Sequence, residues 1–242
     1  PTSDNPHIPA KEIEAMRAEM DAVSYAQEIL AEFRSITGLV YQDFNEANVT
    51  DAEPDLAKPF EVGFDDGYID PRVFLLIQRT SNGVLVFDEI AQSKRLDEES
   101  IRDLLELCCR MYGKPLPEGW PMMTNTARSA WAVSNKVKLP ELAVGSTEAV
   151  QLMRRFREAN IPARGGTHHI VDGIKIVRQL ILDGNGVRSL HVNRRCKGLI
   201  NELTNTYRYP DGVRRDSEKP EDGGDHHADA LRYHLFMRSG RR

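Results

Sequence analysis

Two apolar runs separated by a short polar turn constrain the fold of this chain more than any other feature. The runs are RVFLLIQRT at residues 72–80 and GVLVFDEI at residues 83–90, and the SNG sequence between them suits a tight hairpin. Another apolar run, FEVGF at residues 60–64, comes just before them. We therefore expect three consecutive antiparallel strands.

Alternating helices and strands are expected after this meander. A helix is predicted at residues 97–112, and later helical segments alternate with strands in ELAV at residues 141–144 and VRSLHV at residues 187–192. The short run GWPMMT at residues 119–124 is interpreted as the fourth strand. This order favours an α/β fold in which helices flank a mixed β-sheet.

The first part of the chain is predicted to be a separate helical segment. Apolar residues recur at three- and four-residue steps between residues 9 and 33, which indicates two amphipathic helices or one bent helix. The sequence NEANVTDAEPDLAKP that follows is polar, contains proline and is weakly periodic. We therefore predict a helical segment at 1–45, a linker at 46–58 and a domain at 59–242.

Composition limits the possible settings and functions. The chain has 242 residues, of which 40% are hydrophobic and 29% charged, and this is enough to bury a substantial core. It contains neither an apolar run of roughly 18 residues, as a membrane span needs, nor an N-terminal secretion signal, so we expect a cytosolic protein. The formal net charge of -5 leaves room for local basic patches and does not exclude a nucleic-acid partner.

Two sequence patterns exclude other chemistry. Cys108, Cys109 and Cys196 form neither a CxxC pair nor an even disulfide framework, so we interpret them as buried thiols. The phosphate-loop pattern GxxxxGK[ST] does not occur, which excludes an ATPase of that kind for this chain.

Acidic residues crowd around one glycine turn in EVGFDDGYID at residues 61–70. Asp65, Asp66 and Asp70 repel one another unless water, basic side chains or a bound cation relieves them. Aspartate is common in turns for local hydrogen bonding, so Asp66 and Asp70 have a structural role by default. Asp65 differs, because it directly ends an apolar strand run.

A second group of acids opens the predicted final helix, DHHADALRYHLFM. Asp225 and Asp229 are four residues apart and His226 lies three before Asp229, so all three can share one face. Asp225 also suits an N-cap, and Asp229 could form an ordinary surface pair with histidine. Acids at a strand end and a helix start can hold two divalent cations near a scissile phosphate, and oxygen ligands select Mg²⁺ or Mn²⁺ over zinc.

The sequences VGFDDGYIDPRVFLLIQ, GVLVFDEI and DHHADALRY together resemble the nuclease domain of the large terminase subunit of tailed bacteriophages. The sequences IPAKEIEAM and QEILAEF resemble the helical stretch that follows the ATPase domain in that family. The resemblance implies an RNase H-like fold and a Mg²⁺- or Mn²⁺-dependent endonuclease that cuts double-stranded viral DNA during genome packaging. It also implies an upstream ATPase domain absent from this chain, a host-cytoplasmic setting, and DNA, the portal protein and the small terminase subunit as partners.

In this family the metal-binding acids come from the first strand, the end of the fourth strand and the last helix. Carried over, Asp65 matches the first position and Asp229 the third, with Asp225 and His226 beside it as possible auxiliary ligands. Asn125 stands at the second position, where the family usually has aspartate. An amide brings no charge, so metal affinity should be weakened.

Other acids could compensate for Asn125. Asp66, Asp70 and Asp225 are the candidates, a substitution made to silence cleavage is one alternative, and a misalignment by one or two residues is another. Glu89 closes the predicted third strand, where either a structural or a supporting role is possible.

Binding of DNA requires cations near the acids, because contacts to the phosphate backbone supply most sequence-independent affinity. The sequence offers them in NRRCKG and in the charged loop at residues 207–224. The candidates for DNA contact are Arg194, Arg195, Lys197, Arg214 and Arg215.

Two other functions fit the same residues. An RNase H-like junction resolvase or recombinase nuclease would use the same acids but prefer branched DNA. A catalytically silent module would bind DNA or packaging partners while Asn125 keeps the site empty.

Overall fold

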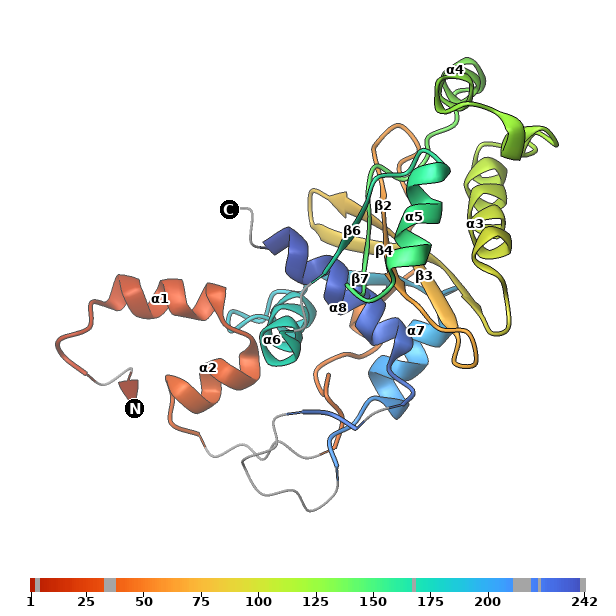
Figure 1. Ribbon diagram of the computed structural model, residues 1–242. Helices are drawn as coiled ribbons and strands as arrows, with labels where there is room; N and C mark the ends of the chain where they lie inside the picture. The colour runs from red at the N-terminus through yellow and green to blue at the C-terminus, as the bar shows by residue number, and fades with distance from the viewer. Residues whose placement is uncertain (3–4, 33–37, 167–168, 211–218, 222, 240–242) are drawn as a thin grey trace.

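The described part of the chain forms one mixed seven-stranded sheet with helices on both faces (Figure 1). The computed structural model describes residues 1–2, 5–32, 38–166, 169–210, 219–221 and 223–239. The strands are β1 (Val49–Thr50), β2 (Glu61–Asp65), β3 (Arg72–Thr80), β4 (Gly83–Gln92), β5 (Ala143–Gly145), β6 (Ala163–Gly165) and β7 (Leu190–Asn193). Their order in the sheet is β1-β7-β4-β3-β2-β5-β6.

The helices follow the sequence pattern closely. They are α1 (Ala10–Glu19), α2 (Ala22–Glu28), α3 (Asp97–Met111), α4 (Asn125–Asn135), α5 (Val150–Glu158), α6 (Ile170–Ile181), α7 (Lys197–Asn201) and α8 (His226–Ser239). Short 3-10 turns span Glu46–Asn48 and Trp120–Met122, and a π-helical turn spans Glu202–Thr206. None of the helices in the described ranges combines the length and apolar content needed to cross a membrane.

All strands of this sheet except one run in the same direction, so their carboxyl ends lie at the same edge. The strands β2, β3 and β4 form the expected antiparallel meander, whereas the other neighbouring strands pair in parallel. All strands except β3 therefore end at the edge where β2 ends at Asp65, which we call the carboxyl edge. The predicted α/β class with a mixed sheet is confirmed.

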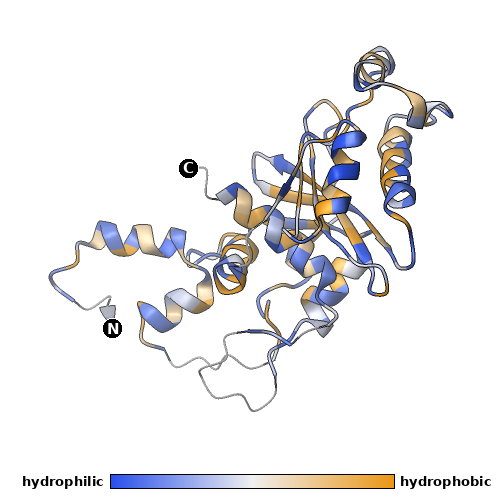
Figure 2. Ribbon diagram, viewed as in Figure 1, coloured by the Kyte–Doolittle hydropathy of each residue, from blue (hydrophilic) through white to orange (hydrophobic). Residues whose placement is uncertain are grey.

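Burial on both faces explains why the central strands are continuously apolar. In β3, Val73, Leu75 and Ile77 join a core with α6 and α8, while Phe74 and Leu76 join a second core with α3 and α5. Side chains of a strand alternate between faces, so a sheet covered on both sides requires apolar residues at successive positions. Figure 2 shows the hydrophobic residues on the central strands and on α6, and hydrophilic residues on the exposed side of α5.

A close contact between α8 and β2 connects this fold to the acidic residues. A Cβ atom added at Gly63 would lie 2.6 Å from the carbonyl oxygen of Ala230 and 3.1 Å from the Cβ of His234. Glycine is therefore needed for the helix to lie this close to the strand. Asp65 follows Gly63 by two residues and Asp229 directly precedes Ala230, so this contact brings the two acids together.

The expected fourth strand at residues 119–124 is wrong. This segment forms the 3-10 turn, in which Trp120 is buried and packs edge-on against Trp131 with the ring centroids 5.7 Å apart. Pro121 has no N–H for a strand ladder, which works against the predicted strand. The fourth strand of the order that begins at β2 is β5.

The expected linker at residues 46–58 takes part in the sheet. It contains β1, which pairs with β7, and the buried amide of Asn48 donates hydrogen bonds to the carbonyls of Leu190 in β7 at 3.0 Å and of Ile181, the last residue of α6, at 3.1 Å. Tyr41 and Phe44, which precede it, are buried in the core that contains α6 and α8. The packing therefore shows no break between residues 41 and 50.

The three cysteines, Cys108, Cys109 and Cys196, are free thiols and all are buried. Burial raises the pKa of Cys109 to about 11, so this thiol is neutral at physiological pH. The prediction of buried thiols is confirmed.

We predict that Gly63→Ala lowers the free energy of unfolding by about 1 to 3 kcal/mol, because the added methyl group pushes α8 away from β2. The matched control is Gly119→Ala, since Gly119 has a φ of -75° and no described atom lies within 4 Å of the position that its Cβ would take. The control should leave stability unchanged or raise it by up to about 1 kcal/mol. Equal losses in urea unfolding would contradict the helix–strand contact.

Candidate metal centre

Three carboxylates converge at the carboxyl edge. Asp65 ends β2, Asp225 directly precedes α8, and Asp229 lies one turn into that helix, where its N–H donates to the Asp225 carbonyl at 2.7 Å. Burial, followed by the charge of Asp229, raises the pKa of Asp225 to about 6. Burial also raises the pKa of Asp65, and the charges of Asp229 and Asp66 add to this effect. The structure thus brings together residues that are 160 positions or more apart.

His226 is the partner of Asp65. Its Nδ1 lies 2.9 Å from Oδ2 of Asp65, and both side chains are largely buried. The hydrogen bond to Asp65 raises the pKa of His226 to about 9, so the imidazole is protonated and donates at neutral pH. The predicted neighbourhood of Asp65, Asp225, His226 and Asp229 is therefore present.

Arg232 is the partner of Asp229, and it was not among the residues predicted from the sequence. Its Nη2 and Nε donate to the two carboxylate oxygens of Asp229 at 2.7 and 3.2 Å. Only 3% of the Arg232 side chain is exposed, and it crosses Gly173 of α6, where a Cβ would lie 2.6 Å from the Arg232 Cγ. The spacing of three residues between an acid and an arginine on a helix was the signal that could have found this pair.

We call Asp65, Asp225 and Asp229 the acid cluster. Its composition fits a hard divalent cation, because carboxylate oxygens are the ligands that Mg²⁺ and Mn²⁺ prefer. In the present arrangement, however, His226 and Arg232 engage the oxygens of Asp65 and Asp229. Within the described ranges, no three His, Cys, Asp or Glu side chains are arranged to hold a metal ion. Binding of a metal therefore requires that these side chains share or exchange their partners.

Asp66 and Asp70 occupy different positions in the β2–β3 turn. Asp66 accepts a hydrogen bond at 2.8 Å from the buried Arg72, which also pairs with Asp97 at 2.6 Å. Asp66 therefore helps to tie the turn to the start of α3, while Asp70 is exposed.

Asn125 lies away from the acid cluster. It is the first residue of α4, and its Oδ1 accepts a hydrogen bond from Arg128 at 3.2 Å. Arg128 also donates to the carbonyl of Glu158, the last residue of α5. Because α5 runs from the end of β5 back towards the start of β6, this contact places α4 at the edge opposite Asp65 (Figure 1). The expectation that Asn125 follows the fourth strand is therefore wrong, and its expected weakening of metal affinity stays a prediction.

The residues that follow β5 take the place expected for Asn125. Phe64 pairs in parallel with Gly145, so the next residues on the two strands, Asp65 and Ser146, are neighbours at the carboxyl edge. The hydroxyl of Ser146 accepts a hydrogen bond at 3.2 Å from the N–H of Glu148, the first acid after β5. The Glu148 carboxylate is exposed and forms no ion pair with another described residue. The short strand Ala143–Gly145 followed by an acid was the signal in the sequence.

Two further carboxylates fix helix positions around the cluster. Glu89 accepts a hydrogen bond from the N–H of Gly198 in the first turn of α7 at 2.7 Å, which is the structural role considered for it. Glu202 accepts from the N–H of Ala228 at 2.8 Å and lies 2.6 Å from Nδ1 of His227. These acids bind the N-terminal turns of α7 and α8, where carboxylates are favourable.

The basic residues predicted to contact DNA are Arg194, Arg195, Lys197, Arg214 and Arg215. The first three follow β7 at the carboxyl edge, where Arg194 pairs with Glu46, Arg195 pairs with Glu53, and Lys197 is exposed. The last two lie outside the described residues. The two ion pairs are exposed, so they cost little to break.

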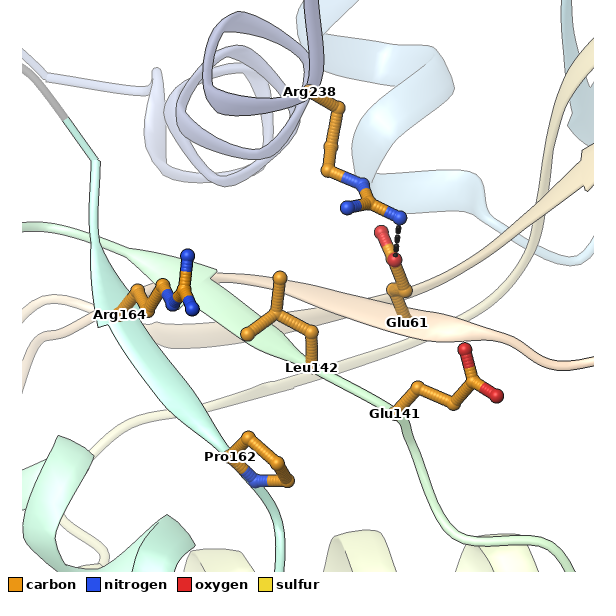
Figure 3. Close-up of a pocket in the computed structure, with 6 residues that line it drawn as sticks. All are labelled: Glu61, Glu141, Leu142, Pro162, Arg164 and Arg238. Atoms are coloured by element: carbon orange, nitrogen blue, oxygen red, sulfur yellow. Dashed lines mark ion pairs between the residues drawn. The ribbon is translucent and has the colours of Figure 1, made fainter. Parts of the chain in front are cut away.

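A pocket of about 220 Å³ lies at the start of β2, at the far end of the strand from Asp65 (Figure 3). Its lining residues are Glu61, Glu141, Leu142, Pro162, Arg164 and Arg238. Figure 3 shows Arg238 reaching from α8 to Glu61, with which it forms an ion pair. This pocket shares no residue with the acid cluster.

Comparison with solved structures identifies the fold. The large terminase of a thermophilic bacteriophage, solved in complex with ATP-gamma-S, matches with a TM-score of 0.71 and 18% identity over 96% of this chain and 53% of that protein. The P22 large terminase nuclease domain matches with a TM-score of 0.56 and 16% identity over 83% of this chain and 92% of that domain. The SPP1 large terminase nuclease domain, solved with bound Mn, matches with a TM-score of 0.52 and 18% identity over 84% of this chain and 99% of that domain.

These likenesses confirm the expected RNase H-like fold, which is the fold of large terminase nuclease domains. The chain spans about half the length of the thermophilic phage terminase. No protein-family model and no curated protein matches the sequence.

We predict that His226→Gln destabilises the protein in a pH-dependent way in the presence of a chelator. In the folded state His226 stays protonated up to about pH 9, whereas a histidine in the unfolded chain loses its proton near pH 6.5. The stabilising contribution is therefore fully present below pH 6.5 and disappears as the pH rises to about 9. The loss of unfolding free energy in the variant should be about 2 to 3 kcal/mol at pH 6 and much smaller at pH 9.

Urea unfolding between pH 6 and 9 measures this difference. His7→Gln is the control, since His7 is exposed in the N-terminal segment. A difference between wild type and His226→Gln that stays constant with pH would show that the charged pair with Asp65 is absent.

Proposed function

We propose that this chain is the nuclease domain of a phage large terminase and that it hydrolyses double-stranded DNA with the help of divalent cations. The single observation that carries the proposal is the convergence of Asp65, Asp225 and Asp229 at the carboxyl edge of an RNase H-like sheet. The manganese in the SPP1 nuclease domain, which has the same fold, supports the choice of cofactor.

Asp65 and Asp229 would hold the metal, with Asp225 as an additional ligand. Bound Mg²⁺ or Mn²⁺ ions supply activation of a water molecule and stabilisation of the leaving oxygen in phosphodiester hydrolysis. The role of the protein is to hold the carboxylates in place, and it does so through the contact of α8 with β2 and through the binding of Glu202 to the first turn of α8. His226 would keep Asp65 oriented between rounds of metal binding.

We propose Glu148 as the second acid in place of Asn125. It follows β5, the strand that lies directly beside β2, and it is two residues beyond Ser146, the neighbour of Asp65. Two residues span at most about 7 Å of backbone, so the Glu148 side chain would begin close enough to Asp65 for the two carboxylates to share an ion.

The same edge of the sheet would receive the DNA. β7 is three strands away from β2, which corresponds to about 14 Å at the usual strand spacing. Arg194, Arg195 and Lys197 therefore lie within the width of a DNA duplex from the acid cluster. Neutralisation of phosphates by these residues would make binding weaken steeply as salt rises.

The wider setting is also part of the proposal. The match to about half of the thermophilic phage terminase is compatible with an ATPase domain elsewhere in the intact protein. By analogy with genome packaging, the portal protein and the small terminase subunit would be partners, and the host cytoplasm would be the setting. A junction resolvase with the same fold is the other nuclease that the cleavage test distinguishes.

We predict that the protein cuts linear duplex plasmid in Mn²⁺ or Mg²⁺ and that a chelator stops the reaction. Asp65→Asn, Asp229→Asn and Glu148→Gln should each lower the rate about 100-fold or more, since each removes several kcal/mol of charge stabilisation. Asp70→Asn and Asn125→Asp are the controls and should leave the rate within about threefold of wild type. Gel electrophoresis of the cut plasmid gives the rates.

Each result separates the alternatives. Faster cleavage of branched than of linear DNA would favour the resolvase, and no cleavage in either metal would favour a binding module. An increase in rate with Asn125→Asp would return that residue to the metal site and contradict the assignment of Glu148.

A further inference from the structure

We propose that Arg232 sets the divalent-ion concentration at which the candidate metal centre fills, because it is a fixed cation that competes with the metal for Asp229. The inference rests on the proposed function, in which Asp229 is a metal ligand. It gives a role to Arg232, which lies in the motif DHHADALRY but was not among the residues predicted for the site.

The geometry makes Arg232 a permanent part of the site. Both oxygens of Asp229 accept hydrogen bonds from its guanidinium, and the side chain is almost fully buried. The aliphatic part of the Arg232 side chain packs so closely against Gly173 that a Cβ atom at that position would clash with it. The guanidinium lies 4.6 Å from the ring centroid of Tyr233. Arginine does not lose its proton in proteins, so this positive charge is always present.

The buried position prevents Arg232 from simply leaving. A buried charge without a partner is strongly unfavourable, so the guanidinium must keep at least one oxygen of Asp229 or find another acceptor. A metal that binds Asp229 therefore does so next to an existing positive charge. The repulsion lowers affinity for the metal and raises the concentration needed to fill the site.

The charge balance of the cluster gives the expected size of the effect. The carboxylates of Asp65, Asp225 and Asp229 face the cations of His226 and Arg232, so removal of Arg232 leaves one more uncompensated negative charge. For a divalent ion bound to Asp229, removal of the unit charge on Arg232 at contact distance corresponds to a gain of about tenfold in affinity, even at the dielectric constant of water.

A matched control exists on the same helix. Arg238 also belongs to α8 and also pairs with a carboxylate, Glu61, but this carboxylate begins β2 whereas Asp65 ends it. Arg238→Met removes the same charge from the same helix about 9 Å further along its axis. It therefore reports the effect of net charge without the contact to Asp229.

The test measures Mn²⁺ binding to the whole chain without DNA, by calorimetry or by the electron paramagnetic resonance of free Mn²⁺. Arg232→Met and Arg232→Gln should bind Mn²⁺ about tenfold more tightly than wild type. Arg232→Lys, which keeps the charge, and Arg238→Met should stay within about threefold of wild type. Circular dichroism in a chelator identifies the variants that fold, and either neutral variant suffices.

Unchanged or weaker Mn²⁺ binding in the neutral variants would overturn the proposal, as would equal tightening in Arg238→Met. Loss of fold in both neutral variants would show a purely structural role and would also overturn it. Plasmid cleavage by wild type is measured separately. A chain that binds Mn²⁺ in an Arg232-dependent way but cuts no DNA would contradict the proposed function alone, since the competition at Asp229 would still hold.

Discussion

The close approach of α8 to β2 is the contact on which the candidate site depends. Gly63 allows the Ala230 carbonyl oxygen to lie 2.6 Å from the position where any other residue would place a Cβ atom. This contact fixes the distance between the end of the strand and the first turns of the helix, and thereby the separation of Asp65 and Asp229. The continuous apolar run of β3 is buried against helices on both faces of the sheet and supports this contact from beneath.

Crowded negative charge at this point is tolerated because protein cations oppose it. His226 pairs with Asp65 and Arg232 pairs with Asp229, while burial and the neighbouring charge hold the pKa of Asp225 at about 6. These pairs balance the cluster without metal, and in the proposed function its carboxylates would bind divalent ions. The same two pairs would therefore stabilise the metal-free protein, and they would compete with a divalent ion for Asp65 and Asp229 when the metal binds.

The sequence predicted the parts of the fold that local patterns determine. The meander, most helices and the neighbourhood of Asp65, Asp225 and Asp229 follow from apolar periodicity and from the quoted motifs. The two-residue strand β1 and the three-residue strand β6 carry too little periodicity to be recognised. The misplacement of Asn125 had one cause. The apolar run that contains Pro121 was interpreted as the fourth strand, and this moved the expected position of the second acid away from the loop after β5. The three-residue spacing of Asp229 and Arg232 could have indicated their pairing, but the burial of Arg232 against α6 depends on long-range packing that no local pattern contains.

The most direct measurement is an anomalous-difference map from crystals of this protein soaked in Mn²⁺. The account predicts manganese peaks within coordination distance, about 2 to 2.5 Å, of oxygens of both Asp65 and Asp229. Manganese bound elsewhere with none at these two carboxylates, in crystals that diffract well enough to locate it, would contradict the account.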